Sequence, residues 1–256
     1  KRGNPLMESV LNNNLTFQSG PQWLYENILH KKWVLAIAGT HGKTTTTAML
    51  TWILEHNGLN PSYLIGGIPT NLTSSSRLVA DKDSKFFVIE ADEYDTAFFD
   101  KRSKFVHYHP RTLVMNNLEF DHADIFDDLD HIKKHFHHLV RVIPEEGRII
   151  SNAKSKALDD VIKLGTWSEL EFFNQVEGWS YQWESKSNSI NILYKNKKQG
   201  CLTWELIGDH NASNALGAIA AANHIGIPIS KSIEALKLFK GVKRRLEKIG
   251  EYKDNI

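Results

Sequence analysis

Residues Trp33–Thr44 (WVLAIAGTHGKT) decide the fold, because they place a glycine-rich loop directly after an apolar run. Residues 33–38 are apolar throughout, which is typical of a buried strand in a parallel sheet. Gly39 and Gly42 allow backbone N–H groups to turn inward onto an anion, and a following helix adds its positive N-terminal dipole. The pattern predicts a loop that binds the phosphates of a nucleotide, with ATP and Mg²⁺ as the favoured ligands.

Two side chains of this loop carry its expected chemistry. Lys43 is the candidate for contact with the outer phosphates, and the hydroxyl of Thr44 is the candidate Mg²⁺ ligand. The wider pattern for such loops has a glycine five residues before Gly42, where this chain has Ile37, so the loop is a shorter variant. The alternative is a glycine-rich turn with an exposed lysine, but the preceding strand and the four threonines after Lys43 favour phosphate binding.

Short apolar runs alternate with longer helical patterns along the chain, which predicts an α/β fold of the P-loop NTPase type, a mostly parallel sheet with flanking helices. The predicted strands are 33–38, 86–91, 112–115, 148–151 and 164–167. The predicted helices are 6–12, 21–29, 44–56, 130–142, 211–225 and 230–239. Between residues 172 and 206 aromatic residues alternate with polar ones, which predicts a small antiparallel β-meander.

The composition is that of an ordinary globular protein, with 41% hydrophobic and 24% charged residues among 256. Lys and Arg (31) nearly balance Asp and Glu (30), which gives no electrostatic reason to expect a nucleic-acid partner. Apolar runs stay well short of the roughly 20 residues of a membrane span, so no membrane partner is expected. The single cysteine, Cys201, precludes an internal disulfide and favours a reducing compartment, hence a cytoplasmic location.

Two polar segments directly follow predicted strands. Glu90 ends the apolar run 86–89, and His122 lies in the segment after the strand at 112–115. Because ligands of open α/β sheets bind outside the carboxyl ends of the strands, we expect both side chains near the glycine-rich loop. Glu90 and His122 are therefore candidate metal ligands beside Thr44. For the acidic run at 90–95, a solvated turn is the alternative.

Seven of the twelve histidines lie between His107 and His138. His131, His135 and His138 are spaced to share one face of a helix, which is compatible with a zinc site. A solvated or partly buried helix face is the favoured interpretation, because no cysteine and no second histidine-rich segment completes such a site.

Five ordered motifs extend the pattern beyond the loop. They are residues 39–45 (GTHGKTT), 90–93 (EADE), 117–124 (NLEFDHAD), 210–215 (HNASNA) and 245–247 (RLE). Together they resemble the motifs of the Mur ligases, a family of ATP-dependent ligases that build and recycle peptidoglycan. The resemblance covers most of residues 33–247.

The resemblance implies a set of site residues. ATP would be bound by Gly39, Thr40, His41, Gly42, Lys43, Thr44, Thr45, His210, Asn211, Asn214 and Arg245. Mg²⁺ would be held by Thr44, Glu90 and His122, and the catalytic residues would be Lys43, Glu90, His122 and Arg245. Asn71 is a candidate contact of the substrate at the reacting phosphate. For His210 and Asn211 the alternative is a helix N-terminal cap.

Within the family, residues 89–102 and 105–126 resemble the branch that joins UDP-N-acetylmuramate to L-alanyl-γ-D-glutamyl-meso-diaminopimelate. The branch that adds L-alanine alone, a folate-type ligase and a non-catalytic nucleotide-binding module are the alternatives. The resemblance divides the chain into the tail of an upstream UDP-binding domain with its linker (1–32), a central ATP-binding domain (33–247) and the start of a linker to a C-terminal domain (248–256). We expect this chain alone to bind ATP weakly and not to form the peptide bond.

Overall fold

The computed structural model describes residues 1–120, 126–184, 188–206 and 208–243. Its helices are α1 (Pro5–Asn12), α2 (Gly20–Asn27), α3 (Lys43–His56), α4 (Leu129–Val140), α5 (Lys156–Lys163), α6 (Asp209–His224) and α7 (Ile229–Lys237), with the short 3-10 helices η1 (Leu29–Lys31) and η2 (Lys104–Tyr108). Its strands are β1 (Trp33–Ala38), β2 (Ser62–Leu64), β3 (Ser76–Arg77), β4 (Phe86–Ala91), β5 (Asp95–Ala97), β6 (Asp100–Ser103), β7 (Thr112–Met115), β8 (Arg148–Asn152), β9 (Glu169–Phe173), β10 (Trp179–Trp183), β11 (Ser189–Tyr194) and β12 (Lys197–Thr203). Strands and helices alternate along much of the chain, which confirms the predicted α/β fold.

Ten of the described strands form one sheet in the order β12-β11-β10-β9-β8-β7-β1-β4-β2-β3, and β5 pairs with β6 in a separate hairpin. The strands from β9 through β8, β7, β1 and β4 to β2 run parallel. Strand β1 lies between β7 and β4, so the carboxyl ends of these three strands meet at one edge of the sheet. Ligands of open α/β sheets bind at such an edge, and the glycine-rich loop begins there.

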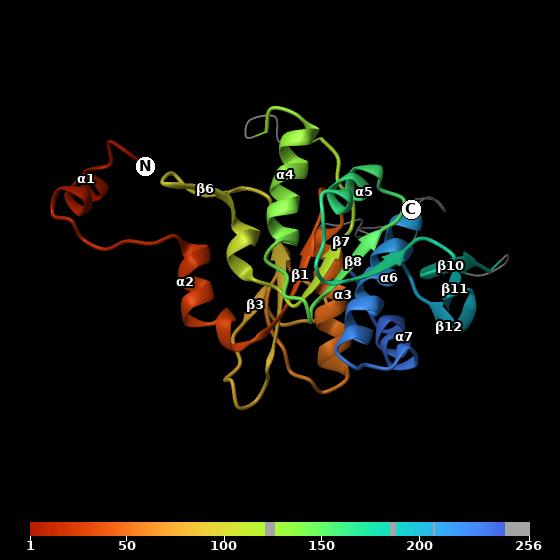
Figure 1. Cartoon of the computed structure of the whole chain (residues 1–256). Helices are drawn as coiled ribbons and strands as arrows, with labels where there is room; N and C mark the ends of the chain where they lie inside the picture. Colours follow the sequence, from red (N-terminus) through yellow and green to blue (C-terminus); the bar gives the residue numbers. More distant parts are fainter. Residues whose placement is uncertain (121–125, 185–187, 207, 244–256) are drawn as a thin grey trace, which may run out of the picture.

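Helices cover both faces of the sheet (Figure 1). Leu35 and Ile37 of β1 pack in a core with α3, α6 and α7, whereas Val34 and Ala36 pack in a second core with α4 and α5. This alternation is the period of two that a strand imposes on its side chains. None of the helices in the described ranges is long and apolar enough to cross a membrane.

The structure corrects one predicted strand. The strands predicted at 33–38, 86–91 and 112–115 are β1, β4 and β7, with the same bounds. The strand predicted at 164–167 is wrong, because Leu164 ends α5 and the strand in this region is β9. Leu164 and Trp167 are 56% and 60% exposed. Their apolar character therefore marks surface residues and not a buried strand.

The predicted meander is confirmed, because β10, β11 and β12 are antiparallel neighbours. It extends the main sheet through a single parallel pair between Trp179 and Phe173. Trp179 is fully buried and its ring lies 4.5 Å from that of Tyr194. This aromatic contact joins two strands of the meander, and the burial of Trp179 beside Phe173 attaches the meander to the core of the sheet.

His224, at the end of α6, makes the stability of this fold sensitive to acid. Its Nδ1 lies 2.9 Å from Oγ1 of Thr112, which also accepts a hydrogen bond from Nε1 of Trp33. Burial, helped by the charge of Arg148, lowers the pKa of His224 from 6.5 to about 4. Between pH 6.5 and 4, His224 binds a proton in the unfolded chain but stays neutral in the folded one. Its contribution to the free energy of unfolding is therefore complete above pH 6.5 and is lost as the pH falls toward 4.

We expect this imidazole to account for about 1–2 kcal/mol of that loss, after allowance for the solvent that reaches a half-buried ring. Urea unfolding across the same pH range checks the prediction, with His224→Gln as the comparison because glutamine does not titrate. The variant should lose less stability than the wild type on acidification. Parallel losses in the two proteins would contradict the assignment.

Candidate functional site

The loop between β1 and α3 has a backbone that favours glycine at two positions. Gly39 and Gly42 have φ angles of 144° and 79°, in a region that other side chains rarely adopt. A Cβ on Gly42 would also lie 2.5 Å from Oδ1 of Asn214. Gly42 is the N-cap of α3, and no described side chain caps it. The first-turn N–H groups of α3 are therefore suited to an anion held in the loop.

Lys43 lies buried between this loop and the acidic segment after β4. Its Nζ donates to the carbonyl oxygen of Gly39 at 2.7 Å and to Oε2 of Glu93 at 3.1 Å. Oδ1 of Asp92 lies 3.8 Å away. The ammonium group is thus held at the loop by acidic partners, close to where the phosphates of a bound nucleotide would lie.

Thr44 and Glu90 come together at the carboxyl edge of the sheet, as predicted. The Thr44 hydroxyl donates to Oε1 of Glu90 at 2.8 Å, and the backbone N–H of Gly66 donates to Oε2 at 2.8 Å. Burial raises the pKa of Glu90 and nearby Asp92 adds to the effect, while the two hydrogen bonds and Lys43 oppose it. A divalent cation beside Glu90 would stabilise the ionised form of this carboxylate. A hydroxyl together with a carboxylate is a donor set that suits Mg²⁺.

The other predicted members of the metal and phosphate site lie outside the described residues. These are His122 and Arg245. Within the described ranges, no group of three or more histidine, cysteine or acidic side chains is placed to hold a metal ion. The roles predicted for His122 and Arg245 therefore stay predictions.

Asn117, which follows β7, fixes the glycine-rich loop from outside. Its Oδ1 accepts from the backbone N–H of His41 at 2.7 Å, and its Nδ2 donates to the carbonyl oxygen of the same residue at 3.1 Å. The hydroxyl of Thr40 adds a second contact, because it accepts from the N–H of Glu119 at 2.9 Å. The segment after β7 therefore sets the loop's conformation. In the sequence, Asn117 stands out only as the first residue of the motif at 117–124.

Replacing Asn117 with alanine should loosen the loop and weaken nucleotide binding about tenfold, because two hydrogen bonds to the backbone of His41 are lost. Asn174→Ala is the matched control. The side-chain amide of Asn174 donates hydrogen bonds to Asn152 and Ser213. None of these three residues belongs to the glycine-rich loop. Calorimetric titration with ATP compares the variants. Equal affinities for Asn117→Ala and Asn174→Ala would argue against the clamp.

Helix α6 brings Asn214 to the loop but does not use Asn211 as a cap. Gly208 is the N-cap of α6, and Asn211 lies inside the first turn with its side chain 7% exposed. The capping alternative is therefore wrong, because the chain enters the helix through a glycine with φ of 94°. His210, next to it, is exposed. Asn214 is hydrogen-bonded by Nδ2 of Asn116, at 3.4 Å.

Asn116 also ties α3 to β7, a contact that sequence reasoning missed. Its Nδ2 donates to the hydroxyl of Thr46 at 2.8 Å. Asn116 is 3% exposed. This buried hydrogen bond therefore links the start of α3, directly after the glycine-rich loop, to the end of β7. The signal in the sequence was a polar residue ending an apolar strand.

Asn71 connects two loops at the same edge. Its Nδ2 donates to the carbonyl oxygen of Leu238 at 2.8 Å, and its Oδ1 accepts from the N–H of Lys240 at 2.7 Å. In this conformation the amide holds the loop after β2 against the segment after α7. Its predicted contact with the substrate stays a prediction.

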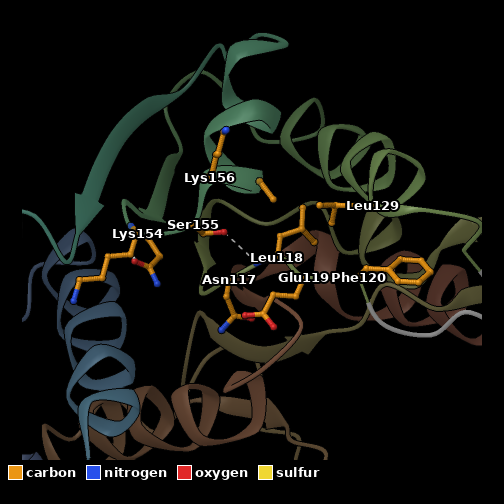
Figure 2. A pocket seen from close by; sticks show the side chains of 10 residues that line it. Asn117, Leu118, Glu119, Phe120, Leu129, Lys154, Ser155 and Lys156 are labelled. Carbon is orange, nitrogen blue, oxygen red and sulfur yellow. Dashed lines mark hydrogen bonds between the residues drawn. The ribbon is translucent and has the colours of Figure 1, made fainter.

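A cleft of about 620 Å³ opens beside the phosphate loop. Figure 2 shows Lys154 and Ser155, from the segment after β8, across from Asn117 and Glu119. The Ser155 hydroxyl accepts from the N–H of Leu118 at 3.3 Å, which closes one end of the wall. Asn117 lines this cleft and also bonds His41 of the glycine-rich loop, so the cleft lies next to the loop.

The histidines of α4 form a partly buried helix face, as the favoured interpretation predicted. His131 is 38% exposed, His135 is half-buried and His138 is exposed. Phe126 packs its ring edge against both His131 and His135. These residues are separate from the contacts described for the loop.

Comparison with known proteins now decides the family. Residues 37–222 match the family model described as the Mur ligase middle domain. The chain belongs to the Mur ligase family. It is 52% identical over 252 residues to the UDP-N-acetylmuramate–L-alanyl-γ-D-glutamyl-meso-2,6-diaminoheptandioate ligase of Haemophilus influenzae, a match that covers 98% of this chain and 55% of that protein. The chain thus spans about half the length of this curated relative.

Two further matches place this Mur ligase chain within its family. The UDP-N-acetylmuramate–L-alanine ligase of Desulfitobacterium hafniense is 33% identical over 93% of the chain and 51% of its own length. The crystal structure of the UDP-N-acetylmuramate:L-alanyl-γ-D-glutamyl-meso-diaminopimelate ligase of Neisseria meningitidis superposes with a TM-score of 0.92. That match has 53% identity and covers 95% of this chain and 77% of the solved one. The predicted family and fold are therefore confirmed.

Proposed function

We propose that this chain is the ATP-binding part of a ligase that joins UDP-N-acetylmuramate to L-alanyl-γ-D-glutamyl-meso-diaminopimelate in peptidoglycan recycling. The observation that carries the proposal is the phosphate loop with Lys43 beside the Thr44–Glu90 pair. It lies in a chain 52% identical to a ligase named for these two substrates. The division into residues 1–32, 33–247 and 248–256 is part of the same proposal.

In the proposed reaction the lactyl carboxylate of the muramyl substrate attacks the γ-phosphorus of ATP, and the bond to ADP breaks. The amine of the tripeptide then adds to the carbonyl carbon of the acyl phosphate, and phosphate leaves. Lys43 would exchange its contact with Glu93 for the outer phosphates and neutralise charge on the transferred group. Mg²⁺, when bound by Thr44 and Glu90, supplies further charge neutralisation at the phosphates.

The remaining loop residues would bind rather than react. The N–H groups of residues 43–45, in the first turn of α3, would face the phosphates, while Asn117 holds the N–H groups of Thr40 and His41. Asn214, at the loop, and His210 and Asn211, in the same first turns of α6, would contact the nucleotide. His122 and Arg245 are proposed to complete the metal and γ-phosphate contacts.

The cleft beside the loop supports the approach of an acidic substrate. Lys154 and Lys156 line it, and it borders the loop through Asn117. Their positive charges favour a carboxylate or phosphate group near the transferred phosphoryl group.

The second candidate is a ligase that adds L-alanine alone. The identity of 33% to such a ligase, against 52% for the tripeptide ligase, favours the first assignment. A non-catalytic module is disfavoured by the buried Lys43 and by the Thr44–Glu90 pair.

Release of ADP by the full-length protein tests the proposal. With UDP-N-acetylmuramate present, ADP should appear when the tripeptide is added and not when L-alanine is added. Dependence on L-alanine alone would overturn the assignment. The 256-residue chain should bind ATP but form no amide product. If the 256-residue chain formed the amide product, the proposal that other domains are needed for the reaction would be wrong.

A further inference from the structure

Two histidines of α4 have the geometry of a metal chelate, and the proposed ligase chemistry does not use them. Nε2 of His135 lies 3.2 Å from Nε2 of His131, one helical turn earlier. Two imidazole nitrogens bound to one tetrahedral zinc ion lie about 3.3 Å apart, given Zn–N bonds of about 2.0–2.1 Å. The spacing of i and i+4 on a helix is also the one by which paired histidines bind zinc in other proteins.

The outer nitrogens of both rings face groups that suit this role. Nδ1 of His135 lies 2.6 Å from the hydroxyl of buried Ser103, at the end of β6. Nδ1 of His131 is buried, lacks a hydrogen-bond partner among the described residues, and lies 3.5 Å from Oδ2 of Asp127. Imidazoles that bind a metal through Nε2 carry their proton on Nδ1 and donate it to a hydroxyl, carboxylate or carbonyl. In a metal-bound pair, both rings would carry their proton on Nδ1 and present an Nε2 lone pair to the ion.

Without a metal, the two Nε2 atoms must share a proton. If Nδ1 of each ring carries its hydrogen toward Ser103 and Asp127, the two lone pairs at Nε2 face each other, which is unfavourable. A divalent cation between them removes that conflict. Burial and the neighbouring His131 and His138 lower the pKa of His135, although Asp95 opposes them, and the lowered pKa favours the neutral form of this ring.

Packing fixes the pair and leaves it open to solvent on one side. The ring of Phe126 lies 5.5 Å from that of His131 and 5.3 Å from that of His135, edge-on to both. His131 is 38% exposed, so an ion from solution can reach it. Because the described residues place no third ligand there, water would fill the remaining coordination positions.

We propose that His131 and His135 form a binding site for a transition-metal dication of the zinc class, separate from the Mg²⁺ site at Thr44 and Glu90. Imidazole nitrogen suits Zn²⁺, Ni²⁺ and Cu²⁺, whereas Mg²⁺ prefers oxygen. Because Ser103 belongs to β6, the bound ion would also fasten α4 to the β5–β6 hairpin.

Calorimetric titration of Zn²⁺ into the chelator-treated 256-residue chain tests the site, with a large excess of Mg²⁺ present throughout. We expect one ion per chain and a higher melting temperature with Zn²⁺. His131→Gln and His135→Gln should each weaken binding about tenfold or more, and Ser103→Ala about tenfold through the outer contact. His138→Gln, on the same helix, is the matched control and should bind as the wild type does.

The melting temperature of each variant without Zn²⁺ establishes that it is folded, and the two glutamine variants test the site independently. Equal affinity in the wild type, His131→Gln and His135→Gln would overturn the proposal. So would displacement of Zn²⁺ by Mg²⁺, or an equal loss of affinity in His138→Gln. None of these outcomes depends on ligase activity, so the site and the proposed function fail or survive separately.

Discussion

Replacing Lys43 with methionine should reduce the affinity for ATP about 100-fold or more. The buried ammonium is the charged side chain that the structure holds at the phosphate loop, 2.7 Å from the carbonyl oxygen of Gly39. Charged hydrogen bonds to phosphate contribute about 1.5–3 kcal/mol each, so losing two of them gives a change of this size. Calorimetric titration of the 256-residue chain with Mg²⁺ and ATP measures it.

The variant also removes the ion pair with Glu93, so lower stability must be distinguished from a lost contact. Lys32→Met provides the matched control, because Lys32 is a second buried lysine whose partners lie away from the loop. Its Nζ donates to the carbonyl oxygens of Ser84 at 2.6 Å and Val79 at 3.0 Å. Lys32→Met should lose stability yet keep its ATP affinity in the folded fraction. Normal affinity in Lys43→Met would remove the loop from its assigned role.

Replacing Glu90 with glutamine should separate function from stability. Glutamine can still accept from the N–H of Gly66 and donate to the hydroxyl of Thr44, so the local fold is retained. The carboxylate proposed as a metal ligand is lost, and the Mg²⁺ affinity of the ATP complex should fall about 100-fold. Titration of Mg²⁺ at fixed ATP measures the loss.

The stability of Glu90→Gln should stay level or rise at neutral pH. A carboxylate whose pKa is raised by burial destabilises the folded state when it is ionised, and glutamine removes that charge. Asp100→Asn is the mirror-image control, because hydrogen bonds from Arg102 hold the pKa of Asp100 at about 2. That variant should lose stability and keep its Mg²⁺ affinity. A Glu90→Gln variant that is destabilised but binds Mg²⁺ normally would identify Glu90 as a structural residue.

Much of the fold was predictable because the central strands are buried on both faces. Strands β1, β4 and β7 are continuous apolar runs bounded by polar residues, and such runs mark their own ends. The sequence was misleading at Leu164 and Trp167, where apolar side chains lie on the surface. Short strands such as β2 and β3 carry too few residues to show a period, so they went undetected.

The positions of candidate site residues were predictable where one residue type has a fixed chemical role. Lys43, Thr44 and Glu90 follow from the loop and from the ends of neighbouring strands. The Asn117 clamp and the Asn116 bond were missed because each depends on which loop faces which across the sheet edge. That pairing is set by the strand order, with β1 between β4 and β7, and no local pattern records it.

The histidines of α4 also show that sequence spacing alone does not determine the role of a residue. The spacing of His131 and His135 was visible in the sequence, but it fits a solvated face as well as a chelate. The proposal of a chelate depends on the contact between the outer nitrogen of His135 and Ser103, which lies 32 residues away in the chain.

Binding of ATP, ADP and AMP by the 256-residue chain, with and without Mg²⁺, tests the central claim most directly. If the loop at Gly39–Thr44 holds the outer phosphates, ATP and ADP should bind in the presence of Mg²⁺. AMP, which lacks those phosphates, should then bind about 100-fold more weakly or not at all. Equal binding of AMP and ATP, or no binding of any of the three, would contradict the account.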